Sequence, residues 1–165
     1  MKKAFGFAGY SGVGKTTLIE ALLPQFTSQG LQVALIKHAH HDFDLDRPGK
    51  DSYRHRAAGA TEVMLICEQR WVILHELHGA PLPPFAEQLE RLGPCDLVLV
   101  EGYQNTPIPK MEVRRKDNPK PFFWLANQDI VAIATNEANL PTTLKQFALN
   151  DYATIAEFIK QTVKL

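Results

Sequence analysis

The chain has 165 residues, of which 45% are hydrophobic and 22% are charged, and its 18 Lys and Arg balance its 18 Asp and Glu. This length predicts one domain over residues 1–165, with an apolar core that needs no disulfides. The balanced charge argues against nucleic acid or an anionic membrane surface as the main partner, and no apolar run is long enough to span a bilayer.

The first predicted elements are a strand, a glycine-rich loop and a helix. Residues 3–8 form a short apolar run typical of a buried parallel strand, and residues 15–29 carry apolar side chains at helical spacing. Between them, residues 9–17 read Gly-Tyr-Ser-Gly-Val-Gly-Lys-Thr-Thr, which matches the phosphate-binding pattern G-x-x-x-x-G-K-T. A glycine turn in an unrelated α/β protein is the alternative, but the order strand, loop, helix is the context that this motif requires.

The residue types of the loop suit a nucleoside triphosphate. The glycines permit φ values that side chains forbid, so that backbone N–H groups can surround the phosphates. Lys15 is expected to act on the β- and γ-phosphates as a catalytic point charge, and the Thr16 hydroxyl is expected to ligate Mg²⁺. The predicted nucleotide-binding residues of the loop are Gly9, Tyr10, Ser11, Gly12, Val13, Gly14, Lys15, Thr16 and Thr17.

A second buried strand is expected within residues 31–37, which gives a βαβ unit with a parallel sheet. The polar segment that follows starts at the carboxyl end of this strand, where doubly wound sheets bind their ligands. His38 is therefore a candidate nucleotide contact. His38, His40 and His41, with three aspartates nearby, could instead hold zinc, although no cysteine is adjacent. A solvated loop is the third interpretation.

The middle of the chain adds a short helix and a hairpin. Asp51 and Ser52 are expected to cap a helix over residues 53–58. Residues 62–67 and 71–77 read as two strands with three residues between them, which predicts a β-hairpin. Basic residues gather in and before the helix: Lys37, His38, Arg54, His55 and Arg56. They either attract a second anionic ligand or are ordinary surface charge.

The two cysteines indicate a reducing compartment. Cys67 and Cys95 each lie beside an apolar run, so we expect two buried thiols rather than a disulfide. No secretory segment follows the first residues, because the phosphate loop interrupts the apolar run. A cytoplasmic protein is expected.

A helix over residues 85–92 is expected to precede an apolar strand at residues 96–102. An apolar strand that ends in an acid, here Glu101, is how phosphate-loop enzymes hold Mg²⁺ or its water, and Glu101 is also the expected catalytic acid. A solvated carboxylate at the strand end is the alternative. Asp96 begins the same strand and should be remote from the nucleotide.

The last third of the chain completes the predicted sheet. Residues 110–115 alternate apolar and polar as a half-exposed strand does, residues 130–134 read as a buried strand, and Asp151 is expected to cap a helix ending near residue 163. The fold class is therefore α/β: a P-loop nucleoside triphosphatase with a mostly parallel sheet, flanking helices and an added antiparallel hairpin. The hairpin and the 110–115 strand are expected near sheet edges, where pairing through one of them would make a two-fold dimer. Alternatively, both only widen the sheet of a monomer.

The base-binding segment is the least specific. After residues 130–134 the chain reads Thr135-Asn136-Glu137, a poor match to the Asn-Lys-x-Asp loop that selects guanine. Asn136 is the candidate base contact, because an amide can bind a base edge. The residues alone do not choose between GTP and ATP.

Several of these segments together resemble the family of molybdopterin-guanine dinucleotide biosynthesis adapter proteins, MobB. They are the phosphate loop, Lys37-His38 with residues 41–44, and residues 48–54, 58–60 and 100–103. The resemblance runs from residue 5 to about residue 134, and the joint pattern is more specific than the phosphate loop alone. One departure is Asn136, which stands where an aspartate is expected for a firm guanine contact.

The resemblance implies a homodimeric protein that binds GTP with Mg²⁺, hydrolyses it weakly and assists the guanylyltransferase that attaches GMP to molybdopterin. The molybdenum-insertion protein is a further candidate partner. Two other functions remain open. One is a P-loop kinase of a small molecule, although the chain after Arg115 is short for an arginine-bearing lid. The other is a metallochaperone GTPase with a metal site at residues 38–41. Turnover with candidate acceptors and metal analysis would distinguish them.

Overall fold

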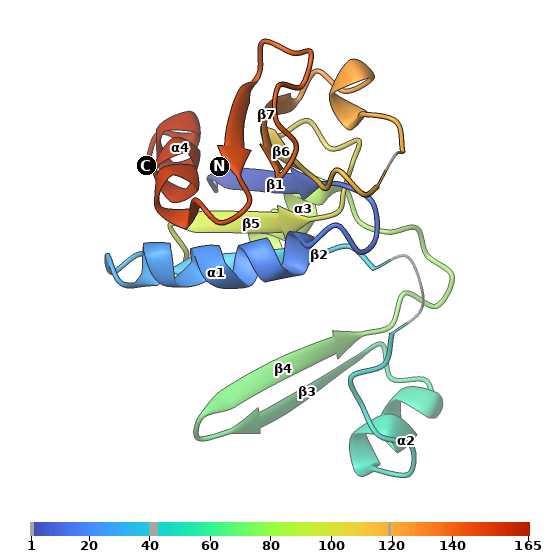
Figure 1. Ribbon diagram of the computed structural model, residues 1–165. Helices are drawn as coiled ribbons and strands as arrows, with labels where there is room; N and C mark the ends of the chain where they lie inside the picture. Colours follow the sequence, from blue (N-terminus) through green and yellow to red (C-terminus); the bar gives the residue numbers. More distant parts are fainter. Residues whose placement is uncertain (1, 40–42, 119) are drawn as a thin grey trace. The chain divides into compact units, whose positions relative to one another are not determined.

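The computed structural model describes residues 2–39, 43–118 and 120–165 (Figure 1). Contacts divide the chain into two compact units, one made of Met1–His38 with Phe85–Leu165 and the other of Ala39–Pro84. The single domain expected over residues 1–165 stays a prediction. Among the described residues, no helix has both the length and the apolar character needed to cross a membrane.

The larger unit is built on a six-stranded sheet in the order β2-β5-β1-β6-β7-β8, in which every neighbouring pair is parallel. The strands are β1 (Ala4–Ala8), β2 (Val33–Lys37), β5 (Leu97–Glu101), β6 (Lys110–Arg114), β7 (Ile130–Thr135) and β8 (Lys145–Ala148). The helices are α1 (Lys15–Thr27), α3 (Phe85–Arg91) and α4 (Tyr152–Val163), with a 3-10 turn at Phe123–Leu125. The mostly parallel α/β fold expected from the sequence is confirmed.

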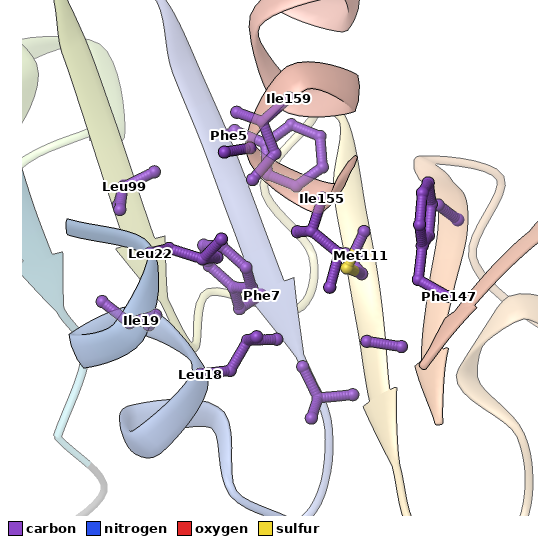
Figure 2. Packing of buried hydrophobic residues seen from close by; sticks show 14 of the residues in the cluster. Phe5, Phe7, Leu18, Ile19, Leu22, Leu99, Met111, Phe147, Ile155 and Ile159 are labelled. Carbon is purple, nitrogen blue, oxygen red and sulfur yellow. The ribbon is translucent and has the colours of Figure 1, made fainter. Parts of the chain in front are cut away.

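One face of the sheet packs against α1 and α4 (Figure 2). Phe5 and Phe7 of β1 point to the same face because alternate residues of a strand share a face. The same core cluster contains side chains from both helices and from β5, β6 and β8: Leu18, Ile19, Leu22, Leu99, Met111, Phe147, Ile155 and Ile159. Each such burial stabilises the fold by about 1.5–3 kcal/mol. This packing fixes the start of α1, and with it the end of the loop that precedes the helix.

The opposite face of the sheet is covered in part by α3. Leu89 of α3 packs with Ala4 of β1 and with Val98 and Val100 of β5.

Asp151 at the start of α4 accepts a hydrogen bond from the Thr154 N–H at 3.4 Å, so the predicted cap of the last helix is confirmed.

The position of β6 corrects one expectation. Its alternating residues predict a half-exposed strand near an edge, whereas β6 lies between β1 and β7 and all five of its residues are buried. Its polar side chains are Lys110, Glu112 and Arg114, and covering loops supply a partner to each. Lys110 donates to the Ile108 carbonyl at 3.0 Å, Glu112 accepts from the Trp124 N–H at 3.1 Å, and Arg114 donates to the Lys120 carbonyl at 2.8 Å.

The edge strand β8 has no counterpart among the predicted elements. Its sequence Lys-Gln-Phe-Ala carries only one large apolar residue, Phe147, which is too little for a period to be recognised. The strand forms because it pairs with β7 along Ala132–Thr135. This edge of the sheet is thus a short, polar strand, which is one way to limit unwanted pairing. The other edge is β2, where the sequence predicts a buried strand but all five residues are half-buried or exposed.

The smaller unit contains α2 (Asp51–Ala57) and the antiparallel pair β3 (Glu62–Cys67) and β4 (Arg70–His75), which confirms the predicted hairpin. The pair forms a two-stranded sheet of its own, so the expectation that it lies near an edge of the larger sheet is wrong. Two further details differ from expectation. The residue before α2 is Lys50, without a side-chain cap, and Ser52 instead donates to Asp46 Oδ1 at 2.9 Å. Cys67 is exposed and Cys95 is half-buried, so the expectation of two buried thiols is wrong.

Arg56 holds the smaller unit together. Its guanidinium donates to both carboxylate oxygens of Asp44, at 2.9 and 3.0 Å, and its Nε lies 3.0 Å from Glu76 Oε1. The hydrogen bond from Arg56 lowers the pKa of the Asp44 carboxyl. These contacts join the 44–46 loop, α2 and the end of β4, so Arg56 has a structural role here.

Candidate functional site

The predicted phosphate loop joins the end of β1 to the start of α1 (Figure 1). Gly12 and Gly14 have φ values of 82° and 99°, in the left-handed region that other residues avoid. Gly9 also has a positive φ, of 150°, and in addition a Cβ there would lie 2.5 Å from the Val113 carbonyl oxygen. The loop therefore needs glycine at these positions in order to fold against β6 and turn into α1.

Lys15 and Thr16 begin α1 and both face the carboxyl end of the sheet. Lys15 Nζ donates to the carbonyl oxygens of Gly9 and Tyr10 at 2.9 Å each, so its ammonium lies within the loop. Burial lowers the pKa of Lys15 from its ordinary value, and the Glu101 carboxylate opposes that shift. Thr16 Oγ1 donates to Glu101 Oε1 at 3.0 Å. The structure thus brings together the three residues that the sequence assigns to phosphate and metal.

Glu101 reaches this position through the register of three strands. It pairs with Phe7 of β1 on one side and with Lys37 of β2 on the other. Lys37 Nζ lies 3.5 Å from Glu101 Oε2, and the glutamate is almost fully buried. Asp96, before β5, accepts from the Gln32 N–H at 2.7 Å, so it is engaged at the amino end of the sheet as expected.

The oxygens of Thr16 and Glu101 suit a hard divalent cation. A hydroxyl and a carboxylate that already touch, beside a loop of backbone N–H groups, are the protein ligands that Mg²⁺ takes together with phosphates. The residues present therefore fit Mg²⁺ and a nucleoside triphosphate.

His38 lies at the border of this site. Its backbone N–H donates to the Glu101 carbonyl at 2.9 Å, and its ring packs on Tyr103 with centroids 4.6 Å apart. Gly102 allows this approach, because a Cβ there would be 3.1 Å from the His38 Cβ. The zinc hypothesis also involves His40, His41 and Asp42, which lie outside the described residues, and Asp44 and Asp46, which the structure describes. Among the described residues, no group of three or more His, Cys, Asp or Glu could hold a metal ion.

A pocket of about 330 Å³ adjoins the other side of the loop. It is lined by the loop and α1 and by the segments that follow β6, β7 and β8: Gly14, Thr17, Leu18, Arg115, Thr135, Asn136, Ala148, Leu149, Asn150 and Tyr152. The structure therefore places Asn136, the predicted base contact, next to the phosphate loop. Pockets of this size at the carboxyl ends of parallel strands are typical of small-ligand sites.

The sequence reasoning missed Arg115. Its Nε donates to the Val13 carbonyl at 3.1 Å, and its Nη2 lies 3.4 Å from the position of a Cβ at Gly14. Arg115 directly follows β6, so it lies with Glu101 at the carboxyl ends of the strands, and this position could have identified it as a site residue. It was missed because residues 110–115 were interpreted as a strand near the edge of the sheet. Arg115 connects the phosphate loop to the pocket.

The side chain of Tyr10 connects the phosphate loop to the 120–125 segment. Its ring packs against Phe123 with centroids 4.6 Å apart, and Lys120 Nζ lies 4.7 Å from the ring centroid. The phosphate loop is therefore tied to the segment that also covers β6.

Comparison with known proteins is consistent with this geometry. The family model of molybdopterin guanine dinucleotide synthesis protein B, MobB, matches residues 4–136. A molybdopterin-guanine dinucleotide biosynthesis adapter protein of Haemophilus influenzae is 40% identical over 94% of this chain and 86% of its own length. The protein of that name from Escherichia coli is 35% identical over 93% of this chain and 89% of its own.

Solved structures share the fold. A crystal structure of molybdopterin-guanine biosynthesis protein B superposes with a TM-score of 0.75 at 24% identity and covers 96% of this chain and 98% of its own. Bacillus subtilis MobB gives a TM-score of 0.75 at 22% identity, with 97% of each chain covered. The family match, the close relatives and the shared fold lead to one conclusion: this chain belongs to the MobB family.

Proposed function

We propose that this protein binds GTP with Mg²⁺ at the Gly9–Thr17 loop and acts as an adapter in the attachment of GMP to molybdopterin. The observation that carries the nucleotide site is the hydrogen bond between Thr16 and the buried Glu101 beside the ammonium of Lys15. The role in molybdopterin-guanine dinucleotide synthesis comes from relatives named for it, of which the chain covers more than four fifths.

The residues of the site have separate roles in this proposal. Lys15 and the loop N–H groups bind the phosphates, and Thr16 and Glu101 ligate Mg²⁺, which when bound neutralises phosphate charge. Glu101 also orients the attacking water in a weak GTPase reaction. We expect hydrolysis to be slow because Arg115, which lines the pocket, is already bonded through Nε to the Val13 carbonyl, and no arginine finger can be assigned. His38 borders the phosphates, and Asn136 contacts the base.

The proposed partners follow from the family. The guanylyltransferase is the main one, and the molybdenum-insertion protein is a further candidate. We place the protein in the cytoplasm, which the two free thiols, Cys67 and Cys95, support.

The hairpin β3–β4 supports a homodimer. Ile66 and Trp71 face each other across the two strands with 74% and 60% of their surface exposed, and Met64 and Ile73 form an exposed pair on the same face. A two-stranded hairpin is marginal in water by itself, and an apolar patch of this kind marks an interaction surface. We propose that two copies pair through this hairpin. The alternative, pairing through β6, is wrong because β6 is internal to the sheet.

The adapter function is tested by reconstitution. Purified guanylyltransferase, molybdopterin-loaded acceptor and GTP are incubated with this protein or with its Lys15→Ala variant, and guanine dinucleotide formation is measured. The intact protein should raise the yield and the variant should not. Equal yields with both proteins and without either would reject the proposal.

The dimer is tested by light scattering at micromolar concentration. The unaltered chain should have the mass of two copies, and Trp71→Lys should give a monomer. The matched control is Leu125→Lys, which places the same charge on an exposed apolar residue of the larger unit. A monomeric unaltered chain would remove the hypothesis.

A further inference from the structure

The pocket beside the phosphate loop differs from the usual guanine site in the polar groups that line it. It adjoins Gly14 and Thr17 and is lined by the segments that follow β6 and β7, so it is the place that we assign to the base of a loop-bound nucleotide. The base selectivity of such a site depends on which donors and acceptors it presents to a base edge. The hydroxyls of Thr17, Thr135 and Tyr152 and the amide of Asn150 line this pocket and can both donate and accept, whereas Asn136 and Arg115 present groups of one kind.

Asn136 presents a donor. Its Oδ1 accepts a hydrogen bond from the Lys116 N–H at 2.9 Å. Because a backbone N–H can only donate, the oxygen of the amide is identified and the NH₂ group is the end that remains for a ligand. An amide can both donate and accept, but with its oxygen bonded to Lys116 the Asn136 side chain presents its NH₂ donor to a ligand.

Arg115 presents donors as well. The guanidinium is anchored through Nε on the Val13 carbonyl at 3.1 Å, and Nη2 lies beside Gly14 at the pocket wall. An arginine has five N–H donors and no acceptor, so its terminal nitrogens add to the donor character of the pocket.

Glu137, the acid next to Asn136, does not supply a carboxylate for the N1 and 2-amino groups of guanine. Glu137 directly follows Asn136, but its Oε2 lies 3.4 Å from Arg114 Nε, and its N–H donates to Thr135 Oγ1 at 3.0 Å. None of the described residues that line the pocket carries a carboxylate. The pocket thus has charged and neutral donors without the acidic acceptor that would bind the N1 and 2-amino groups.

We propose that this pocket recognises guanine through its O6 and N7 acceptors by means of Asn136 and Arg115, and does not read the 2-amino group. Guanine presents two adjacent acceptors on this edge, whereas adenine presents an acceptor next to an amino donor. Adenine would therefore place its amino group against a donor. The inference rests on the proposed function, since it concerns the base of the nucleotide held by the phosphate loop.

The first test compares nucleotides by isothermal titration in Mg²⁺. Inosine triphosphate lacks only the 2-amino group, and 7-deaza-GTP lacks only the N7 acceptor. We expect inosine triphosphate to bind within about threefold of GTP, and 7-deaza-GTP and ATP to bind about tenfold more weakly or worse, the range expected for a lost base-edge contact. Weakening of inosine triphosphate by tenfold or more would show that an acceptor reads the 2-amino group, and would overturn the inference.

The second test changes the donor without changing its size. In Asn136→Asp the oxygen that accepts from Lys116 is kept and the donor becomes an acceptor. GTP and inosine triphosphate should both bind about tenfold more weakly, while ATP binds as before or better. Asn105→Asp makes the same charge change on an exposed loop outside this pocket and should alter none of the affinities.

The outcomes separate the two proposals. A ratio of GTP to ATP affinity that is unchanged or higher in Asn136→Asp overturns the base-reading inference while the phosphate site stands, since a higher ratio would mean that a carboxylate at this position binds guanine. Absence of binding by GTP, inosine triphosphate and ATP alike overturns the proposed function and this inference with it. Binding that survives Lys15→Ala places the nucleotide elsewhere and likewise overturns both.

Discussion

The candidate phosphate site and the covered face of β6 each contain a lysine that donates to backbone carbonyls and a buried glutamate, but the two glutamates have different partners. Lys110 and Glu112 are held by backbone groups: the Ile108 carbonyl for the lysine, and N–H groups of the 3-10 turn for the glutamate. Glu101 contacts side chains instead, from Thr16 and Lys37, which lie on two separate elements.

This difference distinguishes structural from ligand-binding polar groups. Burial lowers the pKa of both Lys15 and Lys110, so a shifted pKa alone does not tell them apart. Location does. Lys110 begins its strand and is enclosed by the 104–109 link, whereas Lys15 follows the carboxyl end of β1 within a loop of positive-φ glycines. The carboxyl ends of parallel strands are where such folds bind ligands.

The largest expected effect is on nucleotide affinity in Lys15→Ala. Loss of the ammonium should weaken GTP binding by more than about 100-fold, because charge-assisted contacts to phosphate are lost. Its partners are two loop carbonyls, so the melting temperature should change little. Titration calorimetry and thermal unfolding measure the two quantities. Retained affinity in a folded variant would contradict the assignment of the phosphate site.

Lys110→Met should reverse this pattern. The carbonyls of Thr106 and Ile108 would lose their donor in a fully buried place, which is expected to cost about 1–3 kcal/mol of unfolding free energy. GTP affinity of the folded protein should not change. Chemical denaturation gives the free energy. If stability is unaffected and GTP binding is lost, the two lysines have been assigned the wrong roles.

Glu101→Gln should separate binding from hydrolysis. The amide keeps the size of the side chain and can still accept from Thr16, but it removes the charge that we assign to Mg²⁺. GTP should still bind, and Mg²⁺-dependent hydrolysis should fall by at least about tenfold, the scale of one lost charged contact. Phosphate release with and without Mg²⁺ measures this. If hydrolysis instead loses its dependence on Mg²⁺ in Asp44→Asn or Asp46→Asn, Glu101 is not the metal ligand.

Glu112→Gln should give the smallest effect, visible in its pH dependence. Burial raises the pKa of Glu112 above its ordinary value of 4.5, and the backbone N–H groups of Phe123 and Trp124 oppose the shift. A raised folded-state pKa contributes stability that is present below the unfolded value and lost as the pH rises through the folded value.

The comparison of unfolding free energies therefore has a defined sign. Relative to Glu112→Gln, the unaltered chain should lose unfolding free energy as the pH rises from 4 to neutrality, because the folded state holds the proton of Glu112 to a higher pH than the unfolded state does. Denaturation of both proteins across this range is the measurement. A constant difference would mean that the glutamate keeps its ordinary pKa in the fold.

The sequence by itself determined the position of the phosphate loop, most strands of the parallel sheet, and the choice of Glu101 as the acid at the end of an apolar strand. These rest on local patterns: glycines at positions that need positive φ, apolar runs long enough to be recognised, and an acid at the end of one such run. The hairpin β3–β4 was predictable for the same reason, since its strands are adjacent in the chain.

Only the tertiary structure decided that β6 is buried within the sheet and where the pocket beside the phosphate loop lies. The alternation in β6 predicts a solvated face, because a sequence pattern cannot show that the 104–109 link and the 120–125 segment will supply partners to Lys110, Glu112 and Arg114. The pocket joins Arg115, Asn136 and Asn150, which follow three different strands. Their proximity depends on strand order and register, which are set by packing across the whole sheet rather than by any local run of residues.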